Sequence, residues 1–271
     1  MTKNSNGKST ILEIKNLSKI YPSSFSFFRK GKEASRAVEN VSFSIHEDEI
    51  VGLVGESGSG KTTVGRAILR LIEPTEGEIL FLGEDLRKFS SRKMRRIRPQ
   101  IQMVFQDPLS SLNPRKTILE NIGEPLLYHK RVKSKEALVE VVSGILQKVG
   151  IPISALYQYP HQFSGGQQQR ISIGRAISLR PKLVVCDEAV SALDLSIQAQ
   201  ILNLLYQLKK SLGLAYLFIS HDLAVVRHLC DRVLVMHEGK IVEEGETKAL
   251  FAGPKHPYTQ KLFSSIPRPP Y

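Results

Sequence analysis

The stretch Gly55-Glu56-Ser57-Gly58-Ser59-Gly60-Lys61-Thr62 fits the pattern G-x-x-x-x-G-K-[ST]. It stands between a short apolar run, residues 50–54, and a segment with helical spacing, residues 62–71. Placed between a strand and a helix, this pattern is typical of a loop that binds nucleotide phosphates. The glycines let backbone N–H groups converge on phosphate oxygens, and the helix N-terminus adds positive potential. We therefore predict a phosphate-binding loop in preference to a chance glycine-rich turn.

Three side chains of this loop have expected roles. Lys61 is expected to reach the β and γ phosphates, Thr62 to ligate Mg²⁺ through its hydroxyl, and Thr63 to help hold the phosphates. The predicted phosphate-binding residues are Gly55, Glu56, Ser57, Gly58, Ser59, Gly60, Lys61, Thr62 and Thr63.

Outward from the loop, apolar strands and amphipathic helices alternate. Expected strands cover residues 11–17, 37–45, 50–54, 78–82, 100–105, 183–186 and 214–219, with a hairpin of 232–236 and 240–244 around Glu238-Gly239. Expected helices cover residues 62–71, 134–149, 195–212 and 222–229. Helices that separate apolar strands predict an α/β fold whose mostly parallel sheet is covered on both faces.

Two stretches depart from this alternation. Residues 107–163 are rich in proline and show helical patterns without a strong strand signal, so we predict a helical insert in which Ser134 caps a helix. Residues 22–36 mix Ser, Phe and basic residues and are expected to form an exposed loop, where the partners of Phe25, Phe27 and Phe28 stay open.

Two carboxylates end an apolar strand at Asp187 and Glu188. In phosphate-loop enzymes an aspartate at this place holds Mg²⁺, and the next glutamate is placed to polarise an attacking water. Adjacent strand residues face opposite ways, so the two acids need not share one role. The alternative is a solvated strand end, which does not explain their coincidence with a phosphate loop. Cys186 is expected to be small core filler.

Gln106 and His221 each follow a predicted strand. An amide can contact Mg²⁺ or water and then release it, and a histidine at the carboxyl end of a strand can reach a γ phosphate or orient water. Taken alone, each residue would more often be structural.

The segment 163–170, FSGGQQQR, places two glycines at the start of a predicted helix. Ser164 can cap that helix, while Gly165 and Gly166 leave bare backbone N–H groups that can approach an anion.

These features occur in one order, and that order resembles the ATP-binding subunit of ABC transporters over nearly the whole chain. Residues 55–63 match the family's Walker A loop, Gln106 its Q-loop, Ser164-Gly165-Gly166-Gln167 its signature, Asp187-Glu188 its Walker B pair, Ser191-Ala192-Leu193-Asp194 its D-loop and His221 its switch histidine. Tyr21 stands where the family stacks an aromatic ring on adenine.

The resemblance implies a fold, ligands and roles. It implies a P-loop NTPase (RecA-like) core with a mostly parallel sheet, an N-terminal antiparallel β subdomain and an inserted α-helical subdomain. The expected division is a core of residues 1–106 and 166–245, an insert of 107–165 and a helical tail of 246–271. ATP and Mg²⁺ are the implied ligands. The implied catalytic residues are Glu188, His221 and Gln106; the ATP contacts outside the loop are Tyr21, Ser164, Gly165, Gly166, Gln167 and Asp194; the Mg²⁺ ligands are Thr62, Gln106 and Asp187.

In that family two ATP-binding subunits pack head to tail around two ATP molecules, each signature facing the partner's phosphate loop. The segments 105–115 and 187–194, with His256-Pro257-Tyr258-Thr259, look like the oligopeptide/dipeptide permease subfamily, which implies peptide import. Nickel, sugars or antimicrobial peptides stay open as alternative cargo.

The chain departs from the family's pattern at two positions. Phe163 replaces a commoner leucine before the signature serine, and Asp48 stands where a turn glycine is usual. The longer relatives' cysteine-bearing tail does not follow Pro269-Pro270-Tyr271, so we expect no iron–sulfur cluster.

The partners implied are transmembrane permease subunits, a second ATP-binding subunit (a paralogue or the chain itself) and, indirectly, a solute-binding protein. The chain shows neither a secretory signal nor an apolar run of the ~20 residues that span a bilayer, so we expect a peripheral protein on the cytoplasmic face of the cell membrane.

The formal charge of +12 could attract nucleic acid or an anionic membrane. No aromatic-basic motif of the kind that binds nucleic acid accompanies it, so we expect no specific nucleic-acid partner. Three classes compete with this interpretation. ABC ATPases that act on DNA usually carry long coiled coils or zinc inserts, and those of translation carry two ATP-binding units, whereas this chain has one such unit and neither insert. A P-loop kinase or GTPase would lack the SGGQ segment, and the sequence contains no guanine-binding motif.

Overall fold

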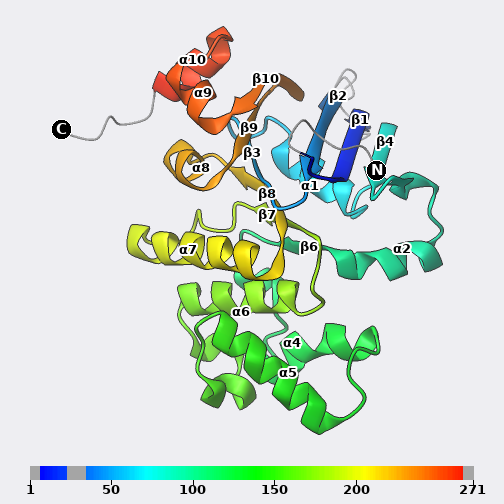
Figure 1. Ribbon diagram of the computed structural model, residues 1–271, viewed down its shortest axis with the longest axis vertical. Helices are drawn as coiled ribbons and strands as arrows, with labels where there is room; N and C mark the ends of the chain where they lie inside the picture. The colour runs from blue at the N-terminus through cyan, green and yellow to red at the C-terminus, as the bar shows by residue number, and fades with distance from the viewer. Residues whose placement is uncertain (1–6, 23–34, 265–271) are drawn as a thin grey trace, which may run out of the picture. The chain divides into compact units, whose positions relative to one another are not determined.

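The computed structural model describes residues 7–22 and 35–264 (Figure 1). The chain divides into two compact units, which are described in turn: a first unit of Met1–Met94 with Leu217–Tyr271, and a second unit of Arg95–Tyr216. Most of the 22–36 loop, including its three phenylalanines, and the last residues of the chain lie outside the described residues.

The first unit contains an antiparallel sheet with the strand order β2-β1-β4-β5. Its strands are β1 (Thr10–Tyr21), β2 (Ser35–His46), β4 (Glu76–Phe81) and β5 (Glu84–Asp85). Leu12, Ile14, Ile45 and Ile79 are buried, whereas their neighbours along the strands, apart from Ile11, are half-buried or exposed, as expected for strands with one covered face. This sheet confirms the N-terminal antiparallel subdomain.

The same unit contains β3 (Ile50–Val54), which pairs in parallel with β9 (Arg232–His237), and β9 pairs antiparallel with β10 (Lys240–Glu246). The predicted hairpin turn is confirmed, because Glu238 and Gly239 have φ of 45° and 82°, the left-handed pair that a two-residue hairpin turn needs. The unit's helices are α1 (Lys61–Ile68), the 3₁₀ turn Leu86–Lys88, α8 (Leu223–Leu229), α9 (Thr247–Ala252) and α10 (Pro257–Ser264).

The second unit joins parallel strands to a group of helices. Strand β6 (Ile101–Val104) pairs in parallel with β7 (Leu183–Asp187). Its helices are α3 (Pro108–Ser111), α4 (Ile118–Tyr128), α5 (Lys135–Lys148), α6 (Gly165–Ile177) and α7 (Leu195–Leu212), with 3₁₀ turns at Arg98–Gln100, Ile153–Tyr157 and Pro160–Gln162. Helices α4, α5 and α6 pack on one another, as Figure 1 shows. The predicted cap of α5 is confirmed: the Ala137 N–H donates to Ser134 Oγ at 3.1 Å.

Two elements cross the boundaries between the units: α2 (Ser91–Ile97) and β8 (Ala215–Ser220). Strands β3, β7 and β8 are buried at every residue, which is the pattern of parallel strands covered on both faces. The predicted mostly parallel α/β fold is therefore confirmed. Among the described residues, no helix is long and apolar enough to cross a membrane.

The expected division into core, insert and tail stays a prediction, because the compact units are divided at other points of the chain. Residues 107–165 do hold helices and 3₁₀ turns without a strand. The short helix α2 is absent from the sequence-based expectation, since its run of basic residues lacks an apolar repeat. At Asp48 the structure explains the departure from glycine: its φ of 51° is the left-handed conformation that aspartate tolerates better than most residues.

Candidate functional site

The phosphate loop of the first unit connects β3 to α1 through glycines that other residues could not replace without strain. Gly55, Gly58 and Gly60 have φ of 154°, 83° and 105°. A Cβ on Gly55 would lie 2.1 Å from the Met236 carbonyl oxygen, and one on Gly60 would lie 2.1 Å from the Ala37 carbonyl oxygen. Both the left-handed backbone and the close packing therefore require glycine at Gly55 and Gly60.

Lys61 is only 5% exposed, and its ammonium group lies inside the loop. Its Nζ donates to the carbonyl oxygens of Gly55 and Glu56, both at 2.8 Å, and to Ser59 Oγ at 3.3 Å. Gly60, the N-cap of α1, provides no capping side chain. The loop thus presents a buried cation beside a helix N-terminus, the combination that binds phosphate.

The other predicted residues of the first unit lie at element ends. Tyr21 is the last residue of β1, and 39% of its surface is exposed. Lys19 Nζ lies 5.1 Å from the centre of that ring. Thr62 and Thr63 follow Lys61 in α1 and are half-buried. His221 is exposed directly after β8, before Asp222, which caps α8.

In the second unit the parallel register of β6 and β7 brings the predicted glutamine and glutamate to one edge of the sheet. Val104 pairs with Cys186, so Gln106 and Glu188 each lie two residues beyond a paired position. Gln106 Nε2 donates to Ser191 Oγ at 3.3 Å, and Ser191 Oγ and N–H donate to the Glu188 carbonyl oxygen at 3.0 and 3.1 Å. The structure therefore links the expected Q-loop, Walker B and D-loop segments through one serine.

Glu188 has a φ of 49°, although it is neither glycine nor asparagine. A left-handed backbone at such a residue costs on the order of 1 kcal/mol and is often found at functional sites. Asp187 precedes it as the last residue of β7 and is only 5% exposed. Burial, aided by the Asp187 charge, raises the pKa of the Cys186 thiol far above its ordinary value, so this cysteine is an inert core residue, as expected.

The signature segment forms the start of α6, and Ser164 caps it as predicted. The Ser164 N–H donates to Gln167 Oε1 at 3.0 Å and the Gln167 N–H to Ser164 Oγ at 3.5 Å, which makes a capping box. Ser164, Gly165 and Gln167 are exposed, as is Asp194, the N-cap of α7.

The glycines of this segment have different surroundings. A Cβ on Gly166 would lie 2.5 Å from Ile197 Cγ2 of α7, whereas a Cβ on Gly165 would first meet Leu193 Cδ2 at 3.8 Å. Both residues begin a regular helix and have no left-handed φ. Within the chain, Gly166 is required for the close packing of α6 on α7, a reason that the sequence did not reveal.

Gln169 is a site residue that sequence reasoning missed. It is 1% exposed, and its Nε2 donates to the Ala189 carbonyl oxygen at 2.7 Å and to the Phe105 carbonyl oxygen at 3.5 Å. One buried amide thus connects the signature helix to the segments that carry Glu188 and Gln106. The only signal in the sequence was its place in the glutamine run after SGGQ.

The residues present fit a magnesium ion carried by a nucleotide. Mg²⁺ bound with ATP takes one or two protein oxygens, phosphate oxygens and waters. Each within its own unit, Thr62 in the first turn of α1 offers a hydroxyl of this kind, and Asp187 at the end of β7 offers a carboxylate. In the part of the chain that the structure describes, no group of three or more His, Cys, Asp or Glu could hold a metal ion.

Comparison with known proteins identifies the class. The ABC transporter family matches residues 38–191, and the C-terminal region of oligopeptide/dipeptide transporters matches residues 242–270. This chain belongs to the ABC transporter ATP-binding family, and it is an ATPase that binds ATP.

Relatives and solved structures agree with this assignment. The oligopeptide transport ATP-binding protein AppF of Bacillus subtilis (strain 168) is 50% identical over 259 residues, 95% of this chain and 78% of that protein. OppF of Lactococcus lactis subsp. lactis (strain IL1403), of the same description, is 49% identical over 96% of this chain and 81% of that protein. The glutathione import protein GsiA of Escherichia coli O157:H7 is 48% identical, with 95% of this chain covered and 41% of that protein. A dimeric ATP-binding cassette, MJ0796, bound to ADP and Pi superimposes with a TM-score of 0.77 at 31% identity, covering 88% of this chain and 99% of the other.

Proposed function

We propose that this chain is the ATP-hydrolysing subunit of a membrane importer of peptides, located at the cytoplasmic face beside its permease subunits and acting in a pair with a second ATP-binding subunit. Relatives named for oligopeptide and glutathione import support the peptide cargo, as does the match of residues 242–270 to the oligopeptide transporter C-terminal region. The single observation that carries the catalytic role is the junction of Gln106, Ser191 and Glu188 at the carboxyl ends of β6 and β7.

The roles proposed for the residues follow from their surroundings. Lys61, already bonded to three oxygens of its loop, exchanges these partners for the β and γ phosphates. Glu188 accepts a proton from the water that attacks the γ phosphate, and His221 orients this water. When bound, Mg²⁺ neutralises developing charge on the phosphates, and Thr62, Gln106 and Asp187 would hold it.

The signature segment is proposed to act on the partner's nucleotide. Ser164, Gly165 and Gln167 are exposed, so a second subunit can reach them. The N-terminus of α6 then offers N–H groups and a serine hydroxyl to a γ phosphate held by that subunit. Tyr21 stacks on the adenine, and Asp194 contacts the shared site.

Glu188→Gln in the assembled transporter tests the catalytic role. The amide cannot take a proton, so kcat should fall at least 100-fold, the lower range for loss of a general base, while ATP affinity stays within about twofold. Glu140→Gln, on the exposed face of α5, is the matched control. Turnover like that of the unmodified protein in Glu188→Gln would remove the general-base assignment.

The cargo is tested separately. The membrane complex is purified with its permease and binding protein, reconstituted in vesicles, and supplied with labelled di- and oligopeptides, glutathione, nickel or sugars. Peptides are expected to stimulate ATP hydrolysis and to accumulate in the vesicles. Stimulation by nickel or a sugar alone would contradict the peptide assignment and leave the ATPase role intact.

A further inference from the structure

The tyrosine of the segment His256-Pro257-Tyr258-Thr259 contacts the phosphate loop directly. The Glu56 N–H donates to Tyr258 Oη at 3.1 Å, across 202 residues of sequence and within the first unit. Glu56 is the second residue of the loop, directly before the exposed Ser57 and Gly58. A hydroxyl of the C-terminal region thus accepts a hydrogen bond from the backbone that leads into the phosphate site.

Tyr258 is held in place from two sides. Its ring stacks on His237, with centroids 3.8 Å apart and planes inclined by 23°, and its N–H donates to His256 Nδ1 at 3.2 Å. His237 is the last residue of β9, next to Met236, whose carbonyl oxygen faces Gly55. The hairpin that supports Tyr258 therefore also packs under the loop.

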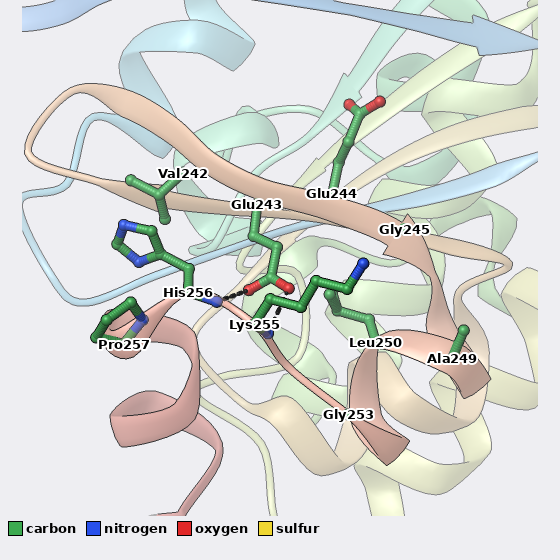
Figure 2. Close-up of a pocket in the computed structure, with 10 residues that line it drawn as sticks. All are labelled: Val242, Glu243, Glu244, Gly245, Ala249, Leu250, Gly253, Lys255, His256 and Pro257. Carbon is green, nitrogen blue, oxygen red and sulfur yellow. Dashed lines mark hydrogen bonds between the residues drawn. The ribbon is translucent and has the colours of Figure 1, made fainter.

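Glu243 of β10 fixes where α10 begins. Its carboxylate accepts the Lys255 N–H at 2.8 Å and the His256 N–H at 3.0 Å, in the wall of a pocket of about 510 Å³ that Figure 2 shows. Burial raises the pKa of Glu243, but the polar Thr259 side chain nearby and the hydrogen bonds from these two amides outweigh it and leave the pKa below its ordinary value. The anchor is therefore a carboxylate at neutral pH.

We propose that Tyr258 is a positioning residue for the phosphate loop, and that residues 242–264, supported by His237 of β9, form a brace for the loop through Glu243 and Tyr258. The hydroxyl occupies the Glu56 N–H and so sets the backbone from which the following N–H groups turn toward the phosphates. A preset loop loses less conformational freedom when the nucleotide binds, which strengthens binding. The inference rests on the proposed nucleotide role of the loop.

Tyr258→Phe in the full chain tests this role, because it removes the hydroxyl and keeps the stacking on His237. Calorimetric titration with ADP and with a non-hydrolysable ATP analogue should show both Kd values about three- to tenfold higher, the effect of one lost hydrogen bond. The binding stoichiometry should be unchanged. Tyr206→Phe removes a hydroxyl from an exposed tyrosine of α7. This variant is the control and should bind nucleotide like the unmodified chain.

A merely structural role would lower the fraction of competent protein, so reduced stoichiometry with an unchanged Kd would overturn the proposal, as would an unchanged Kd at full stoichiometry. Glu243→Gln, which keeps one acceptor and loses the charge, should shift Kd in the same direction by a smaller factor. The unmodified chain and Lys61→Ala separate the two hypotheses. If the unmodified chain binds no nucleotide through Lys61, the proposed function fails; if it does and Tyr258→Phe binds equally well, the brace alone fails.

Discussion

The molecule has two glycine-containing helix starts, and they differ in nearly every physical respect. The phosphate loop before α1 has glycines with left-handed φ, a buried lysine and no capping side chain. The signature segment before α6 has helical glycines, an exposed surface and a complete capping box at Ser164. The first places a buried cation beside the uncapped start of α1, whereas at the second the N–H groups of Ser164 and Gln167 are already bonded within the capping box.

This difference predicts which helix start binds the nucleotide without a partner. The phosphate loop combines buried positive charge with backbone that only glycine adopts, so we expect it to bind ATP in an isolated subunit. The signature has N–H groups but no cation beside them, and its cap already uses the serine. We therefore expect it to matter only when a partner brings a phosphate to it, and four substitutions test this contrast.

The largest effect on binding is expected for Lys61→Ala. The lysine is proposed to make the loop's charged hydrogen bonds to phosphate, and such bonds contribute about 1.5–3 kcal/mol each, so ATP affinity should fall about 10- to 100-fold. Fluorescent-nucleotide titration of the isolated chain measures it, with the exposed Lys148→Ala of α5 as control. Unchanged affinity would show that the loop is not the ATP site.

Ser164→Arg should separate the two helix starts. The arginine adds bulk and charge at a surface proposed to meet the partner, and it removes a cap whose loss costs about 1 kcal/mol. ATP binding by the isolated chain should stay within about twofold, while hydrolysis by the assembled pair should fall by about 100-fold. Survival of hydrolysis in the pair would remove the role proposed across the subunits.

Gly166→Ala and Gly165→Ala should differ in stability. The new methyl at Gly166 would lie 2.5 Å from Ile197 Cγ2, so the free energy of unfolding should fall by about 1–3 kcal/mol, the usual cost of overpacking. A methyl at Gly165 would meet Leu193 Cδ2 at 3.8 Å, an ordinary contact, so Gly165→Ala should be neutral or slightly stabilising. Urea denaturation measures both. If Gly166→Ala combined with Ile197→Ala is no more stable than Gly166→Ala, the clash is not the cause.

The smallest effect is a pH dependence at the brace of the phosphate loop. The folded pKa of Glu243 lies below its ordinary 4.5, so its stabilising effect is complete above that value and is lost as the pH falls through the folded pKa. The Tm difference between the unmodified chain and Glu243→Gln should therefore be constant from pH 8 to about 5 and should shrink below pH 4.5. Scanning calorimetry measures it. Glu76→Gln, at an exposed position, is the control, and a difference that grows toward low pH would contradict the assignment.

Much of the fold could be predicted because it depends on local patterns. Strand β3 and helix α7 begin and end as expected, and Gly213 ends α7 with a φ of 64°. The short helix α2 was missed, because its seven residues show no apolar repeat above chance. The order of the motifs along the chain sufficed to predict the family, which the comparisons confirmed.

The sequence by itself determined the residues of the phosphate loop, the caps at Ser134 and Ser164 and the alternation of strands and helices, since each depends on neighbours a few residues apart. Only the tertiary structure decided that Gly166 packs on Ile197, that Gln169 connects the signature helix to Ala189, and that Tyr258 bonds to Glu56. These contacts join residues 20 to 202 positions apart through single side chains. No local periodicity encodes such a contact, because it depends on where the packing of whole elements places each side chain.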